Sequence, residues 1–289
     1  MPQPGKKSTG GRELSRDELR KERIAIVLMI LICLPILFVY FSFLGNAFMD
    51  RQGNFTFSNF RFLYQSIRLA QYDVPPIGEA FRNSVIFTIV VTIVEVMISA
   101  LAGYAISRID FRGKRLITFS LFALRLFPGV LLLIGMLYVL MYLKIVNTLF
   151  GVIMAAIALR LPGSTFIIRN FFNAIPDDIE NSALVDGCNR FTAFFQVIIH
   201  MVKPGLASIS LFAFMSAWSN YLLFNTLIFT SKTPVLATYV RTLSRNDQMI
   251  ADYGIFSAMA IIYMLPVLVF FFFSQKQLMQ GNMSGGKGI

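Results

Sequence analysis

Six apolar runs divide this sequence, and their length restricts the folds that it can adopt. An α-helix needs about 20 apolar residues to cross the hydrocarbon core of a bilayer. The runs that reach this length cover residues 24–44, 83–107, 116–143, 148–172, 205–229 and 253–274. A soluble fold of 289 residues, 56% of them hydrophobic, could not bury so much apolar surface. The sequence therefore predicts an all-α polytopic membrane protein with six transmembrane helices.

Lys and Arg are distributed unequally between the two sides of these spans. With the N-terminus inside, sixteen fall on the inner side, eight on the outer side, and Arg125 and Arg160 within spans. Cytoplasmic segments carry the excess of Lys and Arg in membrane proteins, and RIDFRGKR at 108–115 is the firmest indicator. We therefore predict cytoplasmic termini, a basic tail at 1–23, a membrane domain at 24–274 and a flexible, Gly-rich tail at 275–289.

Several other classes of function are disfavoured by the same residues. The net charge of +11 does not indicate nucleic-acid binding, because the basic residues flank apolar runs. The segment GKKSTGG lacks the residue order of a phosphate-binding loop, and no strand precedes it. The single histidine, His200, has no cluster of cysteines or histidines with which to hold zinc. We expect no nucleic-acid partner, no metal and no cofactor in this chain.

An acidic stretch between the fourth and fifth runs interrupts the apolar sequence on the predicted cytoplasmic side. Pro176 should end the preceding helix, Asp177 or Asp178 can cap a new one, and Gly187 can stop it in a left-handed turn. Glu180 adds a favourable charge near the start of that helix. A second helical stretch follows, with apolar residues at helical spacing: Phe191, Phe194, Phe195, Ile198, Ile199 and Val202.

The loop, residues 173–204, should thus form a helix–glycine–helix unit across the ends of the spans. An exposed helix of this kind fits a groove on a partner protein. An ordinary interfacial loop helix is the alternative that the pattern leaves open.

The same loop resembles the characteristic loop of binding-protein-dependent ABC importer permeases. Their signature is EAA, three residues, Gly, nine residues, then I-x-L-P. The matching positions here are Asn181, Ser182, Ala183, Asp186, Gly187, Val197, Ile199 and His200. Asn181 replaces the family's Glu, Ser182 an Ala and His200 a Pro, whereas Pro204 matches a second proline of the sugar-transporting branch.

Other segments extend the resemblance over most of the chain. They are NSVIFT, LAGYAISRIDFRGKR, LFPGVLLLIGMLYVL, LPGSTFIIRNFFNAIP, FMSAWSNYL and QKQLMQGNMSGGKG. These resemble the carbohydrate-uptake subfamily, specifically the second, six-span permease of the maltose type. The resemblance implies a type I ABC importer permease fold with a cytoplasmic coupling helix, in a bacterial inner membrane.

The resemblance also implies partners and a division of labour. Two unlike permeases would form the pathway, two ATP-binding subunits would hold ATP and Mg, and an extracytoplasmic solute-binding protein would deliver the carbohydrate. This chain would transport and not catalyse. The implied contacts with the ATP-binding subunits are Glu180, Asn181, Ser182, Ala183, Asp186 and Gly187. The tail at 275–289 would add a further contact.

Three charged residues, Glu95, Arg125 and Arg160, lie near the middle of predicted spans. A central arginine disfavours insertion by about 3 kcal/mol, so each should face protein or water. Glu95 and Arg125 lie at comparable depths, which makes a buried pair that fixes packing one interpretation. The other is that the arginines line the pathway, where their positive excess suits an acidic oligosaccharide built of uronates, such as alginate.

The fifth run holds Trp218, Asn220 and Tyr221, which offer aromatic faces and an amide for sugar contact. Packing is the alternative for this group. Pro128-Gly129 and Pro162-Gly163 are expected to interrupt the third and fourth spans, as broken helices do at transporter sites.

Two other classes of function remain as alternatives. A membrane-embedded enzyme would need a nucleophile or metal constellation, and His200 has no partnering motif. A secondary carrier driven by an ion gradient would predict internal repeats, and we find no clear repeat.

Overall fold

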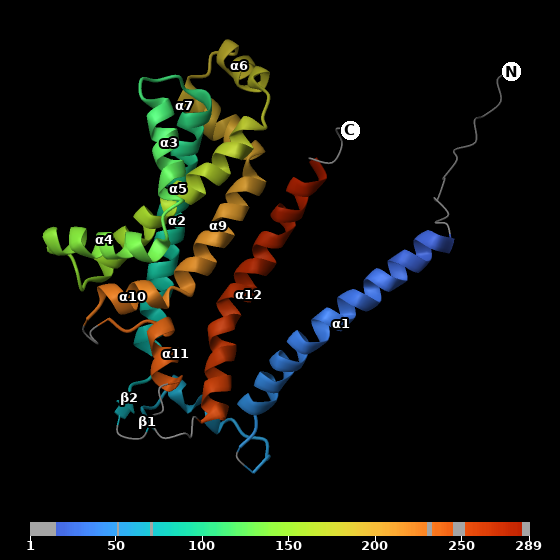
Figure 1. Cartoon of the computed structure of the whole chain (residues 1–289), viewed down its shortest axis with the longest axis vertical. Helices are drawn as coiled ribbons and strands as arrows, with labels where there is room; N and C mark the ends of the chain where they lie inside the picture. The colour runs from blue at the N-terminus through green and yellow to red at the C-terminus, as the bar shows by residue number, and fades with distance from the viewer. Residues whose placement is uncertain (1–15, 51, 70–71, 230–232, 245–251, 285–289) are drawn as a thin grey trace.

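The computed structural model describes residues 16–50, 52–69, 72–229, 233–244 and 252–284. The elements, in chain order, are α1 Arg16–Ala47, η1 Ser58–Leu63, β1 Ile67–Leu69, β2 Tyr72–Val74, α2 Gly78–Arg108, α3 Lys114–Leu124, α4 Gly129–Tyr142, α5 Leu149–Asn173, α6 Asp177–Val185, α7 Arg190–Ala193, η2 Phe194–Ile198, α8 Ile199–Met201, α9 Lys203–Trp218, α10 Tyr221–Leu227, α11 Leu236–Ser244 and α12 Tyr253–Ser284. Figure 1 shows the resulting helical bundle. The predicted all-α class is confirmed.

Four helices among the described residues, α1, α2, α5 and α12, are long and apolar enough to cross a membrane. Two bent pairs raise the number to six if each pair counts as one span: α3 with α4, bent by 110°, and Arg190–Met201 with α9, bent by 79°. The six predicted runs all correspond to helices, but the third and fifth do not form single straight rods.

The two Pro-Gly pairs differ in their effect on the helices. Pro128 is the N-cap of α4, four residues after α3 ends at Leu124, and it disfavours helical backbone at the residue before it. Pro162 instead lies inside a continuous α5, so the predicted interruption at Pro162-Gly163 is wrong. Membrane helices tolerate an interior proline where neighbouring helices surround the freed backbone groups.

The predicted fifth span, 205–229, is divided in two. Helix α9 ends at Trp218, and α10 begins after Asn220, whose side chain accepts a hydrogen bond from the Leu223 amide at 3.1 Å. This cap satisfies a free amide at the start of α10 and lets the chain turn there.

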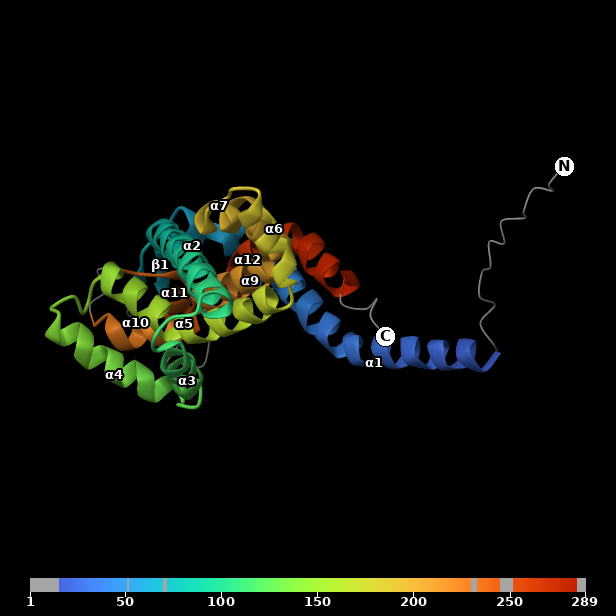
Figure 2. The same cartoon turned by 90° about the horizontal axis from the view of Figure 1, so that it is seen from above.

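Helices α2, α5 and α9 form the centre of the bundle, and α12 packs against α9. Small residues allow the close approach that membrane helices need. A Cβ added at Gly103 of α2 would lie 2.6 Å from the Ile168 side chain of α5. One added at Gly205 of α9 would lie 2.5 Å from the Phe171 ring. Figures 1 and 2 show α1 diverging from this centre, beside α12 at one end only.

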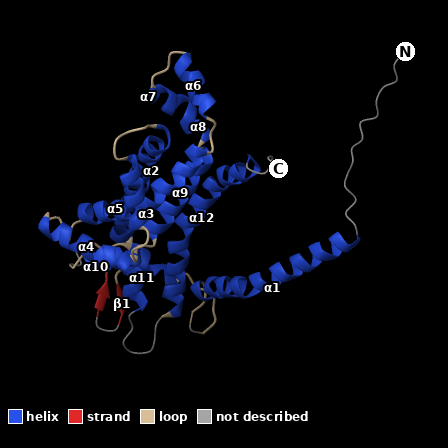
Figure 3. Cartoon of the chain, turned by 45° about the horizontal axis from the view of Figure 1, so that its top comes forward, coloured by secondary structure: helices blue, strands red, loops and turns tan. Residues whose placement is uncertain are grey.

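The end of the bundle opposite α6 carries the short hairpin of β1 and β2 beside α11 (Figure 3). Asn59 fastens the preceding loop by donating hydrogen bonds to the carbonyls of Ala47 and Met49, at 3.0 and 2.9 Å. The Tyr239 hydroxyl of α11 donates to the Pro75 carbonyl at 2.9 Å, and burial raises the pKa of Tyr239 to about 12. These bonds join segments that are distant in the sequence.

The structure describes only part of each predicted tail, 1–23 and 275–289. Residues 1–15 of the N-terminal tail lie outside the described residues, and α1 begins at Arg16. Helix α12 continues to Ser284, so the first part of the predicted flexible tail, 275–289, is helical. Residues such as Gln275, Lys276 and Leu278 are good helix formers, which explains the continuation.

Candidate functional site

Helix α6 lies beyond the ends of the long helices, at one extreme of the molecule (Figure 1). It begins after Pro176 and is followed by Gly187, whose φ of +91° is left-handed. The predicted boundaries and the left-handed turn are therefore confirmed. The predicted side-chain cap is not formed, because Pro176 occupies the N-cap and Asp177 instead pairs with Arg108 of α2.

One face of α6 is fixed to the bundle through Glu180, whose exposure is only 4%. The Tyr104 hydroxyl donates to Glu180 Oε1 at 2.6 Å. Arg108 Nε lies 3.5 Å from Glu180 Oε2, and Arg190 NH1 lies 3.8 Å from Oε1. Ala183, one turn further on, is also buried. Glu180 and Ala183 thus point into the chain, which corrects the expectation that they form part of an outward contact set.

The opposite face of α6 is open. A shallow groove of about 430 Å³ is lined by Asp178, Asn181, Ser182, Val185 and Asp186. Three of the expected contact residues, Asn181, Ser182 and Asp186, therefore lie on one surface. Val185 was not predicted, although its side chain is 87% exposed. An apolar residue at the end of a polar helix, directly before Asp-Gly, is the signal that could have identified it.

The second part of the loop differs from a regular helix. Residues Phe194–Ile198 form a π-helical turn, η2, in which hydrogen bonds run from i to i+5 and each turn holds an extra residue. Phe194 and Ile198 are buried, but Phe191 and Phe195 are exposed. The predicted continuous apolar face is thus only partly correct, because the π turn rotates side chains away from α-helical spacing. Phe194 packs on Tyr104, with ring centroids 4.8 Å apart.

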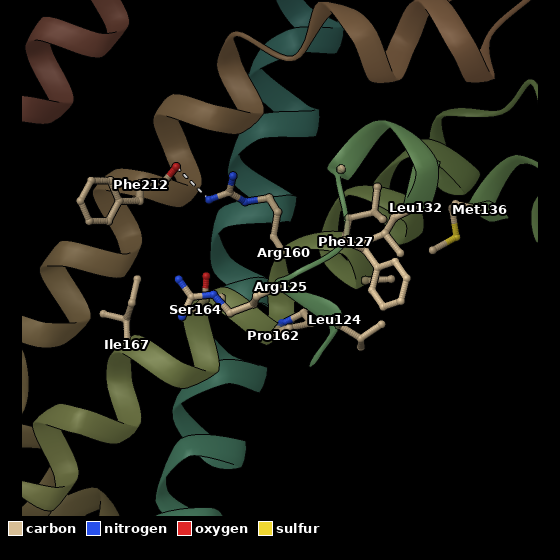
Figure 4. A pocket seen from close by; sticks show the side chains of 14 residues that line it. Leu124, Arg125, Phe127, Leu132, Met136, Arg160, Pro162, Ser164, Ile167 and Phe212 are labelled. Carbon is tan, nitrogen blue, oxygen red and sulfur yellow. Dashed lines mark hydrogen bonds between the residues drawn. The ribbon is translucent and has the colours of Figure 1, made fainter. Parts of the chain in front are cut away.

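An open pocket of about 520 Å³ lies at the middle of the length of α5, between α3, α4 and α9, and is called the central cavity below (Figure 4). Its lining includes Arg125, Arg160, Ser164 and Phe212. Arg160 Nε donates to Glu95 Oε2 at 2.8 Å, and Arg160 NH2 donates to the Phe212 carbonyl at 3.0 Å. The Ser164 hydroxyl donates to the other oxygen of Glu95, which is fully buried.

The predicted Glu95–Arg125 pair is not the one that forms. Close packing of α2 on α5 places Arg160 and Ser164 opposite Glu95. Arg125 follows α3 instead, and its guanidinium lies 5.1 Å from the centre of the Phe166 ring. No carboxylate of the described residues forms an ion pair with Arg125. Both predicted arginines do line the same cavity.

Trp218, Asn220 and Tyr221 do not line this cavity. Trp218 is 2% exposed, and its Nε1 donates to the Tyr263 carbonyl of α12 at 2.8 Å. Asn220 caps α10. The Tyr221 hydroxyl donates to Asn225 Oδ1 at 2.7 Å. These residues have packing and capping roles here, because α9 lines the cavity at Phe212 and Trp218 to Tyr221 lie further along the chain.

The sequence model of binding-protein-dependent transport system inner membrane components matches residues 95–279. The diacetylchitobiose uptake permease protein NgcG of Streptomyces coelicolor is 31% identical, over 73% of this chain and 69% of that protein. The maltodextrin permease protein MdxG of Bacillus subtilis is 27% identical, over 82% of each.

Solved structures share the fold. Among them is a bacterial ABC transporter involved in the import of the acidic polysaccharide alginate, with a TM-score of 0.75 and 19% sequence identity. The match covers 91% of this chain and 98% of that chain.

Proposed function

The chain belongs to the family of binding-protein-dependent transport system inner membrane components, and on that premise we propose that it is a permease subunit of an ATP-driven importer of a carbohydrate. The observation that carries the proposal is the family match over 95–279, which includes both α6 and the central cavity. The curated relatives are named for uptake of diacetylchitobiose and maltodextrin. Members of this family are inner-membrane components of transport systems.

The open face of α6 is the surface that an ATP-binding subunit would contact. Asn181, Ser182 and Asp186 offer polar groups there, and Val185 offers an apolar side chain for a groove. This assignment puts α6 and both chain termini in the cytoplasm, in agreement with the excess of Lys and Arg on that side. A second permease and two ATP-binding subunits complete the importer, and a solute-binding protein delivers the cargo from outside.

The central cavity is where the cargo would pass. Its lining holds two arginines, of which Arg160 is paired with Glu95 and Arg125 is paired with no described carboxylate. The cavity therefore carries a net positive charge, which suits an acidic oligosaccharide through charge-assisted hydrogen bonds. This part of the proposal rests on the charge of the lining, since the alginate importer shares the fold at only 19% identity.

The test is reconstitution. Tagged chain is expressed with its neighbouring transport genes, and the complex that it retains is placed in liposomes with the binding protein. We expect a second permease and an ATP-binding subunit to co-purify with the tagged chain. We also expect an oligosaccharide to cross the liposome membrane only when ATP is present on the side that carries α6. Sugar uptake driven by an ion gradient with no ATP would contradict the proposal and favour a secondary carrier.

A further inference from the structure

The last turns of α2 hold a pair of side chains that reach out of the bundle toward α6. Tyr104 and Arg108 are four residues apart, so they lie on the same face of the helix. Both contact the same carboxylate: the Tyr104 hydroxyl binds Glu180 Oε1 at 2.6 Å, and Arg108 Nε lies 3.5 Å from Oε2. Glu180 thus accepts a hydrogen bond from Tyr104 and forms an ion pair with Arg108, whose Nε makes no hydrogen bond.

Arg108 also fastens the segment that connects α5 to α6. Its NH2 donates to the Phe172 carbonyl at 2.9 Å and to the Ile175 carbonyl at 2.5 Å, and its NH1 pairs with Asp177. The side chain is 7% exposed. One guanidinium therefore joins α2, the end of α5 and the start of α6.

Burial makes these contacts costly to break. A buried carboxylate that loses its partner is destabilising, because neither water nor another group replaces the lost bonds. The Tyr104 ring adds packing, since it contacts the rings of Phe172 and Phe194 at centroid distances of 5.8 and 4.8 Å. The connection of α2 to Glu180 is therefore both polar and aromatic, and the side chains of Tyr104, Arg108 and Glu180 are buried.

The same helix reaches the central cavity. Glu95, which binds Arg160 and Ser164, lies nine residues before Tyr104 on α2, about 14 Å along the axis at 1.5 Å per residue. Helix α6, by contrast, is joined to α5 in the chain only through residues 174–176. Arg108 holds this connection to α2 through the carbonyls of Phe172 and Ile175, and Tyr104 holds α6 itself through Glu180.

We propose that Tyr104, Arg108 and Glu180 form a clamp that makes α6 and α2 move together, so that these positioning residues set how much cargo is moved for each ATP hydrolysed. The inference rests on the proposed function and adds to it: ATP-binding subunits would act on the open face of α6, and the clamp on the buried face would carry the movement to the cavity.

The experiment compares two variants in the reconstituted importer. Tyr104→Phe removes one hydroxyl and keeps the ring, and Glu180→Gln keeps the shape of the side chain and removes its charge. Matched controls are Tyr40→Phe, on the exposed surface of α1, and Glu79→Gln, on the exposed first turn of α2. Uptake and ATP hydrolysis are measured in the same vesicles, together with the amount of ATP-binding subunit retained.

We expect each clamp variant to keep its ATP-binding subunits and its ATP hydrolysis while uptake per ATP falls by about tenfold, as for loss of a buried hydrogen bond to a charged group. The double variant should lose little more than either single one, because the two residues share one bond. Both controls should match the unmodified chain.

Two results would overturn the clamp. One is uptake per ATP that stays unchanged in both variants. The other is a proportional fall of uptake and hydrolysis with loss of the ATP-binding subunits, which would assign these residues to docking or to folding alone. If the unmodified chain shows no ATP-driven uptake, the proposed function fails first, and the two failures are thereby distinguished.

Discussion

Two buried glutamates have similar partners: Glu95 lies on α2 beside the central cavity, and Glu180 lies on α6 against the end of α2. Each accepts a hydrogen bond from a hydroxyl, of Ser164 or Tyr104, and each pairs with arginine. They differ in the balance of charge around them. At α6, Arg108 and Arg190 face Glu180 and Asp177, two cations against two carboxylates.

At the central cavity the balance is different. Glu95 compensates Arg160, and Arg125 remains as a cation on the lining. The comparison indicates two roles. At α6, equal numbers of cations and carboxylates form a joint that holds α6 against α2, whereas at the cavity the extra cation, Arg125, is available to a ligand.

Replacing Glu95 by Ala should break the central cluster most severely. Arg160 would lose its only described carboxylate partner inside the bundle, and Ser164 would lose its acceptor. Breaking a buried pair from one side costs about 3 kcal/mol or more, so the thermal unfolding temperature of the purified protein in detergent should fall markedly. Glu79→Ala is the control, and an unchanged unfolding temperature in Glu95→Ala would contradict the importance of the pair.

Replacing Arg108 by Ala should break the cluster at α6 with a somewhat smaller effect. The variant loses the contacts with Glu180 and Asp177 and the bonds to two main-chain carbonyls. We expect a loss of about 2 kcal/mol, because the Asp177 carboxylate, which is 81% exposed, regains water when Arg108 is removed. The rate of limited proteolysis within the 173–204 loop reports this loss of local stability. Arg112→Ala, on the exposed α2–α3 connection, is the control. Equal protection of the two variants would count against the joint.

Replacing Arg125 by Gln should change selectivity and leave stability nearly untouched. The side chain contacts the Phe166 ring and no described carboxylate, so its loss leaves no buried charge unpaired. Uptake of an acidic oligosaccharide should fall about tenfold, which corresponds to about 1.4 kcal/mol, while uptake of a neutral one changes little. The idea of a cationic pathway fails if both cargoes lose uptake to the same extent.

Replacing Arg190 by Gln should have the smallest effect. Its side chain is 53% exposed and lies 3.8 Å from Glu180 Oε1. Exposed ion pairs contribute about 0 to 1 kcal/mol, so both thermal stability and uptake per ATP should stay close to those of the unmodified chain. A loss of stability as large as that of Arg108→Ala would show that the exposed Arg190 also helps to hold α6 against the bundle.

Local rules were sufficient for part of this architecture. Pro176 and Gly187 set the limits of α6 through backbone chemistry alone, a missing amide hydrogen at one end and a left-handed φ at the other. The long apolar runs located the four described helices that are long and apolar enough to cross a membrane, α1, α2, α5 and α12, because length and composition decide whether a segment can cross a bilayer. The family's loop was recognisable even though Asn181 and Ser182 depart from its signature.

Features that depend on packing between helices could not be read in this way. Pro128-Gly129 and Pro162-Gly163 look alike in the sequence, yet one accompanies a sharp bend and the other lies in a continuous helix between neighbours. The partner of Glu95 is likewise decided by the close approach of α2 to α5 at Gly103. The buried direction of Glu180 follows from Tyr104, 76 residues away in the chain.

The turn between α3 and α4 has a consequence for hydration. Residues 125–128 leave the helical ladder in the middle of an apolar run, and the chain changes direction by 110°. Main-chain amides and carbonyls outside a helix cannot face acyl chains, since each unsatisfied group costs several kcal/mol in oil. Arg125 and Phe127 from this turn also form part of the cavity wall. Solvent or another polypeptide must therefore cover this turn, so the side of the bundle that carries Arg125 cannot face lipid directly.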